Sequence, residues 1–263
     1  MNEVVIITGG TSGIGLATAK LLRSKGYRVY DFSRRPHADT PDHLSVDVTD
    51  EAAVRAAVEA LYAREGRIDI LINNAGFGIS GAVEFTEPAE AKKQMEVNFF
   101  GCVNMTRAAL PHMRQRGSGR IVNISSVAAP AAIPFQAYYS ASKAAINAWT
   151  AALANELRPW GVSVTAVQPG DIKTGFTAAR EKSAVGDDAY GGRIARSVAR
   201  MEKDEQGGMT PEAAARTIVR VATKPGNVKP YYTIGLSYKC LVFLDNLLPC
   251  GAVKRLLYML YAK

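Results

Sequence analysis

Tyr139 and Lys143 are the residues of this sequence whose types and spacing most directly suggest chemistry. Side chains four residues apart lie on one face of a helix. A phenol loses its proton only near pH 10, and a fixed ammonium nearby stabilises the phenolate and lowers that pKa. We therefore expect Tyr139 to exchange a proton with a carbonyl or an alcohol, with Lys143 as its electrostatic partner. Such a pair also occurs by chance in many helices, so the surrounding elements decide its meaning.

Short apolar runs alternate along the chain with segments of helical periodicity. The runs predict strands at residues 4–8, 28–32, 43–46, 68–72, 120–124, 162–167 and 231–234. Helices are predicted from the glycine-rich segment after the first strand to residue 25, and at 50–65, 138–157 and 211–223. The segment 88–116 is predicted to form two helices that meet near 98–101. The alternation predicts an α/β fold, a Rossmann-type doubly wound parallel sheet, in one domain over residues 1–263. Ligands bind at the carboxyl ends of such strands, where the motifs described below all fall.

The composition limits the class of protein. The chain has 263 residues, of which 48% are hydrophobic, a mean hydropathy of −0.03 and a net charge of +8. These values predict a soluble globular protein, and the positive charge favours an anionic small molecule such as a phosphorylated cofactor. We expect no nucleic-acid partner, because no recognised nucleic-acid-binding motif accompanies the charge.

Targeting and cysteine patterns predict a cytoplasmic protein. No apolar run approaches the roughly 20 residues that span a bilayer, and the apolar start at residues 4–7 is too short for a secretory signal. Cys102, Cys240 and Cys250 have no metal-ligand spacing, and their odd number argues against a disulfide framework. We therefore expect no metal site.

A glycine-rich turn links the first strand to the first helix. It contains Gly9, Thr11, Ser12, Gly13, Ile14 and Gly15. Glycines at this place let the backbone approach a pyrophosphate closely, and the helix N-terminus favours the phosphate charge. The spacing therefore predicts a dinucleotide site.

The end of the second strand indicates which dinucleotide is bound. An NAD site usually has an acid there for the ribose hydroxyls, whereas this sequence has Ser33 followed by Arg34 and Arg35. Guanidinium groups suit a 2′-phosphate, which favours NADP(H). Two alternatives remain: both arginines are solvated loop charges, or the strand ends two residues earlier and Asp31 selects NAD.

Several motifs now occur in order and at consistent spacing. They are the glycine turn, Asn73-Asn74-Ala75-Gly76, Asn98, Ser126, Tyr139 with Lys143, and Pro169-Gly170. The chain resembles the short-chain dehydrogenase/reductase superfamily over essentially residues 1–235. The set of motifs is far more specific than any one of them.

The resemblance implies roles for the reacting residues. Tyr139 would be the general acid/base, and Lys143 would hold the nicotinamide ribose and lower the pKa of the tyrosine. Ser126 would bind the substrate oxygen, and Asn98 would hold a water in a proton relay that reaches Lys143. The neighbouring Ser125 is instead expected to satisfy its hydroxyl on the backbone.

The resemblance also implies further cofactor contacts. Asp47 and Val48 match the adenine pocket, although Asp47 is equally typical of a turn. Asn74, Ala75 and Gly76 would lie near the adenosine ribose, while Asn73 braces the sheet. Pro169, Gly170, Ile172 and Thr174 match the loop that holds the nicotinamide carboxamide, although Pro-Gly alone also indicates a turn.

The regions after the last motif are expected to choose the substrate. Residues 176–208 predict a helical lid over the pocket. Residues 236–263 predict an amphipathic tail that either packs on the body and walls the pocket, joins subunits, or lies on a membrane surface. The first two placements are favoured over the membrane contact. The tail resembles superfamily members that handle steroids, retinoids and acyl-glycerol ketones, which implies a bulky hydrophobic ketone or alcohol.

The sequence therefore predicts an NADP(H)-dependent oxidoreductase that transfers hydride between nicotinamide and a hydrophobic carbonyl or alcohol. We expect a homodimer or homotetramer. The alternatives are an NAD-dependent alcohol dehydrogenase and a non-catalytic NADP(H)-binding sensor or scaffold, which would have no need to keep Ser126, Tyr139 and Lys143.

Overall fold

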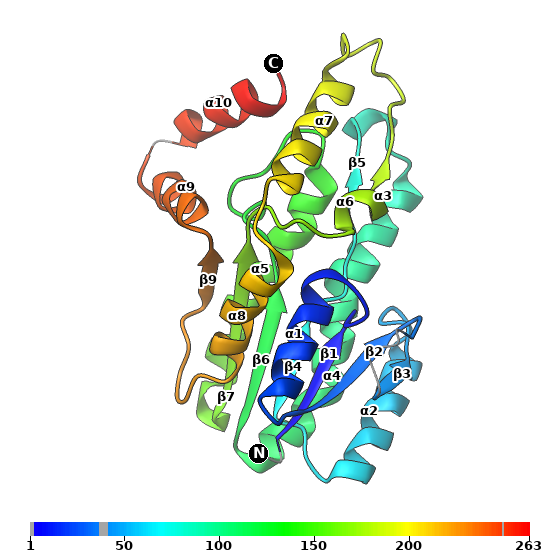
Figure 1. Ribbon diagram of the computed structural model, residues 1–263, viewed down its shortest axis with the longest axis vertical. Coiled ribbons are helices and arrows are strands. Elements are labelled where there is room, and N and C mark those ends of the chain that lie inside the picture. The colour runs from blue at the N-terminus through cyan, green and yellow to red at the C-terminus, as the bar shows by residue number, and fades with distance from the viewer. Residues whose placement is uncertain (1–2, 37–41, 249) are drawn as a thin grey trace.

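The computed structural model, which describes residues 3–36, 42–248 and 250–263, is built on a seven-stranded parallel sheet (Figure 1). Its order is β3-β2-β1-β4-β6-β7-β9. The strands are β1 (Val4–Thr8), β2 (Arg28–Ser33), β3 (His43–Ser45), β4 (Ile70–Asn73), β6 (Gly119–Ile124), β7 (Val162–Pro169) and β9 (Tyr231–Ile234). The strand order reverses between β1 and β4, and ligands bind at such a switch point.

Helices cover both faces of the sheet. One face packs against α1 (Gly13–Ser24) and α8 (Pro211–Ala222), which lie side by side in Figure 1. The other face packs against α2 (Glu51–Glu65), α4 (Gly101–Arg116) and α5 (Ala137–Glu156). Because side chains alternate along a strand, Val5 and Ile7 of β1 reach the first layer, and Val4 and Ile6 reach the second. The predicted doubly wound α/β fold is confirmed.

The long helical segment before β6 is interrupted where the sequence predicted that two helices meet. It consists of α3 (Pro88–Met95), a π-helical turn (Glu96–Phe100) and α4. Two short strands, β5 (Ile79–Ser80) and β8 (Glu181–Lys182), pair with each other outside the main sheet and were not predicted. A strand of two residues is too short to show periodicity.

The regions after β7 contain helices, as predicted. Residues 176–208 hold α6 (Phe176–Ala179), β8 and α7 (Arg193–Gln206). The tail forms α9 (Leu236–Leu247) and α10 (Cys250–Tyr261), and single 3-10 turns occur at Val83–Phe85 and Arg158–Trp160. Within the described residues, none of the helices has both the length and the apolar character needed to cross a membrane.

Asp69 joins several segments at the amino-terminal edge of the sheet. Its side chain is 6% exposed and accepts hydrogen bonds from the Val4 N–H at 2.7 Å and from Arg67 at 2.7 and 2.8 Å. Arg116, at the end of α4, lies 2.7 Å from the same carboxylate. Burial raises the pKa of Asp69, but Arg67, the Val4 N–H and Arg116 outweigh it and hold that pKa below its usual value.

We predict that Asp69→Asn lowers the free energy of unfolding by about 1–3 kcal/mol at pH 7, since two guanidinium groups lose their buried partner. The depressed pKa of the folded state means that this stabilisation is complete above the unfolded-state pKa of about 4. It is lost as the pH falls through the folded-state pKa, so wild type and variant should converge in acid.

Urea unfolding at a series of pH values measures this difference. Asp188→Asn is the matched control, because Asp188 is exposed. A deficit of Asp69→Asn that stays constant from neutral pH into acid would contradict the prediction.

Candidate active site

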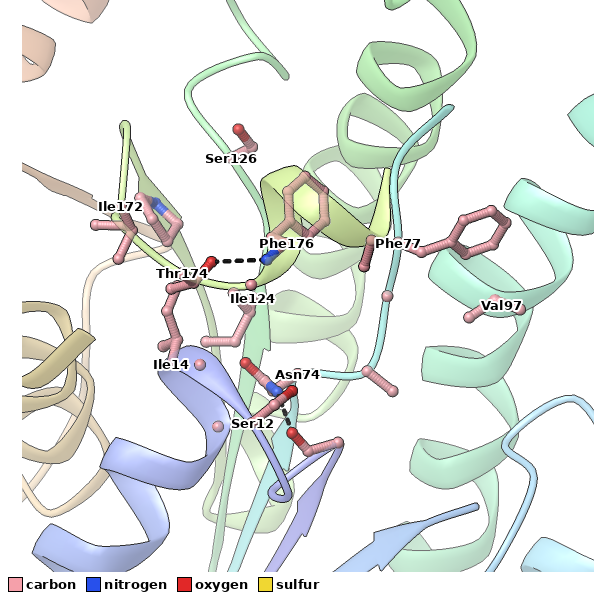
Figure 2. Close-up of a pocket in the computed structure, with 18 of the residues that line it drawn as sticks. Ser12, Ile14, Asn74, Phe77, Val97, Ile124, Ser126, Ile172, Thr174 and Phe176 are labelled. Atoms are coloured by element: carbon pink, nitrogen blue, oxygen red, sulfur yellow. Dashed lines mark hydrogen bonds between the residues drawn. The ribbon is translucent and has the colours of Figure 1, made fainter. Parts of the chain in front are cut away.

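A cavity of about 620 Å³ lies along the carboxyl ends of the strands. Figure 2 shows Ser12, Ile14 and Asn74 toward one end and Ser126 and Phe176 toward the other. The cavity brings together all but one of the predicted site residues. They are Gly9, Thr11, Ser12, Gly13, Ile14, Gly15, Ser33, Arg34, Arg35, Asp47, Val48, Asn74, Ala75, Gly76, Ser126, Tyr139, Lys143, Pro169, Gly170, Ile172 and Thr174.

The glycine turn packs too closely for side chains. A Cβ on Gly15 would lie 2.2 Å from the Gly9 carbonyl oxygen, and Gly9 itself adopts a φ of +65°. The Thr8 hydroxyl accepts from the Asn74 and Ala75 N–H groups, both at 2.9 Å, and the Asn74 amide donates to the Thr8 and Gly9 carbonyls at 3.0 and 3.1 Å. The end of β4 therefore holds the turn in place.

The same turn suits an anionic dinucleotide. Helix α1 begins at Gly13, and its first residues line the cavity. Its N-cap residue Ser12 makes no side-chain capping hydrogen bond, so that side chain does not occupy the first N–H groups of the helix. Arg34 and Arg35 are exposed side chains on the same wall. This donor set fits a pyrophosphate and a further phosphate group.

Asp31 does not reach the cavity lining. It lies inside β2, is fully buried, and accepts from the Gly10 N–H at 2.5 Å and from the Ser33 hydroxyl. Its other near neighbour is His43 Nδ1, at 2.9 Å. Strand β2 ends at Ser33, and the Ser33 hydroxyl donates to Asp31.

Asp47 combines its two expected roles. One carboxylate oxygen accepts from the Thr49 N–H at 3.0 Å and from the Thr49 hydroxyl at 2.8 Å, which makes it a turn residue, yet it also lines the cavity. Burial raises its pKa, but the Thr49 hydrogen bonds and nearby Arg34 hold the pKa below its usual value. The charge of Arg34 therefore acts on Asp47, and both residues line the cavity.

The reacting groups meet where β6 ends against α5. Lys143 Nζ donates to the Ile124 carbonyl at 2.8 Å, and the Ser125 hydroxyl donates to the Lys143 carbonyl at 3.1 Å, as expected for a backbone-satisfied serine. The next residue, Ser126, lies at the cavity wall together with Tyr139, and its hydroxyl is close enough to lower the pKa of that phenol. The Ser126 oxygen also accepts from the Ala128 N–H at 3.1 Å.

The pKa of Tyr139 differs from the sequence expectation. Burial raises it to about 12, and Ser126 rather than Lys143 opposes the increase. Burial also lowers the pKa of Lys143 to about 8, because its ammonium is 5% exposed. Lys143 Nζ lies 5.7 Å from the centre of the Tyr139 ring and directs a hydrogen bond to the Ile124 carbonyl, so desolvation outweighs its effect on the phenol.

Asn98 is the predicted residue that does not line the cavity. It lies in the π-helical turn, is 1% exposed, and its amide pairs with the backbone of Phe77, accepting from the N–H and donating to the carbonyl, both at 3.0 Å. It also donates to the Ser142 hydroxyl on α5 at 3.0 Å. Asn98 therefore supports the cavity wall from behind, next to Gly76.

The loop after β7 closes one side of the cavity. The Thr174 hydroxyl accepts from the Phe176 N–H at 3.1 Å (Figure 2), and the Phe176 ring lies 5.7 Å from the Tyr139 ring. A Cβ on Gly170 would lie 2.2 Å from the Tyr238 ring, so this position requires glycine for packing with the tail. The predicted lid thus contributes Phe176 directly beside the tyrosine.

Sequence reasoning missed several residues that line the cavity. They include Phe77, Val97, Val127, Ala128, Ile133, Gln136, Asp171, Ala179 and Glu205. Asp171 lies between Gly170 and Ile172, so the motif that begins at Pro169-Gly170 could have indicated it. Gln136 and Glu205 belong to no recognisable sequence pattern. Buried Arg180 pairs with Glu205, which also accepts from the Thr177 hydroxyl.

The tail supports the cavity without lining it. Among the described residues of 236–263, none belongs to the lining. Tyr238 donates to Asp171, and Tyr261 donates to Asp204 at 3.1 Å, next to Glu205. The tail therefore packs on the body, which is one of the placements that the sequence favoured. The expectation that it walls the pocket is wrong, because none of its described residues lines the cavity.

Comparisons with known proteins agree with this geometry. The sequence profile of the short chain dehydrogenase family matches residues 3–184. The chain is 42% identical over 226 residues to the 3-ketodihydrosphingosine reductase of Bacteroides thetaiotaomicron, covering 84% of each chain. It is 33% identical over 254 residues to the probable short-chain type dehydrogenase/reductase VdlC of Helicobacter pylori, covering 94% of this chain and 93% of that protein.

A solved structure agrees over nearly the whole chain. A short-chain dehydrogenase from Streptomyces avermitilis superposes with a TM-score of 0.84 and 30% identity, covering 98% of this chain and 95% of that one. Together with the Ser126, Tyr139 and Lys143 arrangement, these likenesses show that the chain belongs to the short-chain dehydrogenase/reductase family of oxidoreductases.

Proposed function

We propose that this protein uses NADP(H) to reduce a carbonyl group on a long hydrophobic substrate. The observation that carries the proposal is that the hydroxyls of Ser126 and Tyr139 line the same cavity beside the buried Lys143. Bound reduced nicotinamide supplies the hydride. The protein supplies the hydrogen bonds and the proton.

Two hydroxyls can stabilise the substrate oxygen. Ser126 and Tyr139 donate to the oxygen as negative charge grows on it, which is where preorganised donors lower the barrier most. With a pKa of about 12, Tyr139 is protonated at neutral pH, which is the form that delivers a proton. This protonation state favours the reductive direction.

Arg34 and Arg35 support NADP(H) rather than NAD(H). Both line the cavity just after β2, and Asp31, the acid that would select NAD, is buried and bound to Gly10. Because the Ser33 hydroxyl donates to Asp31, the 2′-phosphate would be bound mainly by the two guanidinium groups. Members of this fold bind either nicotinamide cofactor, so the arginines carry this part of the proposal.

The substrate end of the cavity fits a long-chain ketone that carries an amine. Val127, Ile133 and Phe176 offer apolar walls, while Asp171 adds a carboxylate close enough to influence the pKa of Tyr139. Glu205 lies at the same wall but is already paired with Arg180. An ammonium beside the reacting carbonyl would complement Asp171, and it would oppose the raised pKa that burial gives that carboxylate. The relative that is a 3-ketodihydrosphingosine reductase supports the same substrate class.

The proposal is tested by following the absorbance of reduced nicotinamide with a panel of ketones. We expect 3-ketodihydrosphingosine to be reduced faster than a ketone of equal chain length without the amine, and faster than a steroid ketone. In Tyr139→Phe, turnover should fall by roughly 10²–10⁴-fold while NADPH affinity is kept. If wild-type protein binds NADPH but reduces none of these ketones, the sensor alternative is correct.

Adjacent serines provide a matched pair of variants. Ser126→Ala should lower kcat/KM by roughly 10²-fold, because one donor to the reacting oxygen is lost. Ser125→Ala should keep kcat/KM within about threefold, because its hydroxyl contacts only the Lys143 carbonyl and the loss is that of one hydrogen bond. Steady-state kinetics compares them, and equal losses in both variants would argue against the role given to Ser126.

Cofactor choice is tested with Arg34→Ser. Removing a charge-assisted contact to the 2′-phosphate should raise the KM for NADPH about tenfold and leave the KM for NADH nearly unchanged. Arg55→Ser, an exposed change on α2, is the control. An equal effect of Arg34→Ser on both cofactors would show that the arginine does not read the 2′-phosphate.

A further inference from the structure

Helices α9 and α10 each use one face to pack on the body. Val253 and Leu257 of α10 are buried with Ala131, and Leu241 of α9 packs against them. The hydroxyls of Tyr238 and Tyr261 add polar anchors to Asp171 and Asp204. The orientation of both helices on the protein is therefore defined, and so is the face that each one turns outward.

The outward face of α9 is apolar. Leu236, Phe243, Leu244 and Leu247 are 79%, 63%, 39% and 65% exposed. Their spacing of seven, eight and eleven residues from Leu236 places them on one stripe of the helix. A surface helix of a globular protein normally exposes its polar side, whereas α9 exposes an apolar stripe.

The outward face of α10 is also apolar. Leu256, Met259 and Leu260 are 39%, 53% and 41% exposed, and Leu248, which follows α9, is 40% exposed. Figure 1 shows α9 and α10 together at the outer edge of the molecule, beside α7 and beyond β9. We name the exposed apolar residues of these two helices the tail face: Leu236, Phe243, Leu244, Leu247, Leu256, Met259 and Leu260. A contiguous apolar surface of this kind marks an interaction site.

The charges in the tail are mostly positive. Residues 236–263 contain four basic residues and one acidic residue, Asp245. Lys239, Arg255 and Lys263 are exposed. Apolar side chains with basic neighbours are complementary to an anionic lipid surface, where the leucines and the phenylalanine enter the acyl boundary and the cations meet the headgroups. A two-fold contact between two copies would instead bring the basic residues of one tail toward those of the other.

We propose that the tail face binds the protein to the surface of an anionic lipid bilayer. This contact lies next to the cavity, because Ala131 packs under α10 while Ala128 and Ile133, in the same loop, line the cavity. The loop thus links the part of the protein under α10 to the cavity wall. The binding itself does not depend on the identity of the substrate.

Flotation with lipid vesicles tests the proposal with the full-length protein. In low-salt buffer we expect the protein to float with vesicles of equal parts phosphatidylglycerol and phosphatidylcholine, to bind pure phosphatidylcholine at least about tenfold more weakly, and to release in about 0.5 M salt. Phe243→Ser with Leu247→Ser should lower the partition coefficient at least about tenfold. Lys239→Glu with Arg255→Glu should do the same on the anionic vesicles only.

Matched controls change the same residue types elsewhere on the surface. Val83→Ser, at a side chain 53% exposed, and Arg55→Glu on α2 should bind the vesicles like wild type. Circular dichroism and light scattering confirm that each variant is folded and report its mass in solution.

Two results would overturn the proposal. One is that wild-type protein fails to float with the anionic vesicles at low salt. The other is that Phe243→Ser with Leu247→Ser leaves flotation unchanged but converts an oligomer to a monomer, which would make the tail face a contact between copies of the chain. Both results leave the proposed reductase activity untouched, because that activity is measured without vesicles.

Discussion

The hydrogen bond from the Lys143 ammonium to the Ile124 carbonyl, 2.8 Å long, is the contact on which the rest of the site depends. Burying an ammonium is costly, and the pKa of about 8 reflects that cost. This bond holds α5 against the end of β6, so that Tyr139, one turn before Lys143, lies near Ser126, two residues after Ile124. The Ser125 hydroxyl, which donates to the Lys143 carbonyl, adds one minor contact between the same elements. The proton donor and its partner come from two elements that only this junction brings together.

Polar side chains extend this junction across the switch point of the sheet. Asn98 connects the strand end near Phe77 to Ser142 on α5, and its π-helical turn bends the chain just where that contact is needed. Asn74 connects β4 to the glycine turn after β1. The dinucleotide end and the reacting end are thus parts of one hydrogen-bonded edge. Such support keeps donors aimed before a substrate arrives, which is what electrostatic stabilisation of a reacting oxygen requires.

The substrate end is built differently, from segments held by charge pairs at the periphery. Glu181 and Lys182 of β8 pair with Lys93 of α3 and Glu202 of α7, and Arg180 pairs with Glu205. These contacts close the region 176–208 over Tyr139, while the tail binds this region at Asp204 and the preceding loop at Asp171 through two tyrosine hydroxyls. Recognition of the substrate therefore depends on residues that are far apart in the sequence and that share no motif.

The sequence alone determined the parallel sheet and the glycine turn, because strand periodicity is local and the carboxyl ends of parallel strands share one edge. The meeting of Ser126 with Tyr139 and Lys143 was expected from the resemblance to the family. The sequence also placed two helices meeting at Asn98. Only the tertiary structure decided that Asn98 lies behind the cavity wall, that Asp31 is buried away from it, and that the pKa of Tyr139 rises rather than falls. Only the tertiary structure decided which faces of α9 and α10 are buried against the body. Desolvation and burial are sums over side chains brought together from distant parts of the chain, so no spacing along the sequence reports them.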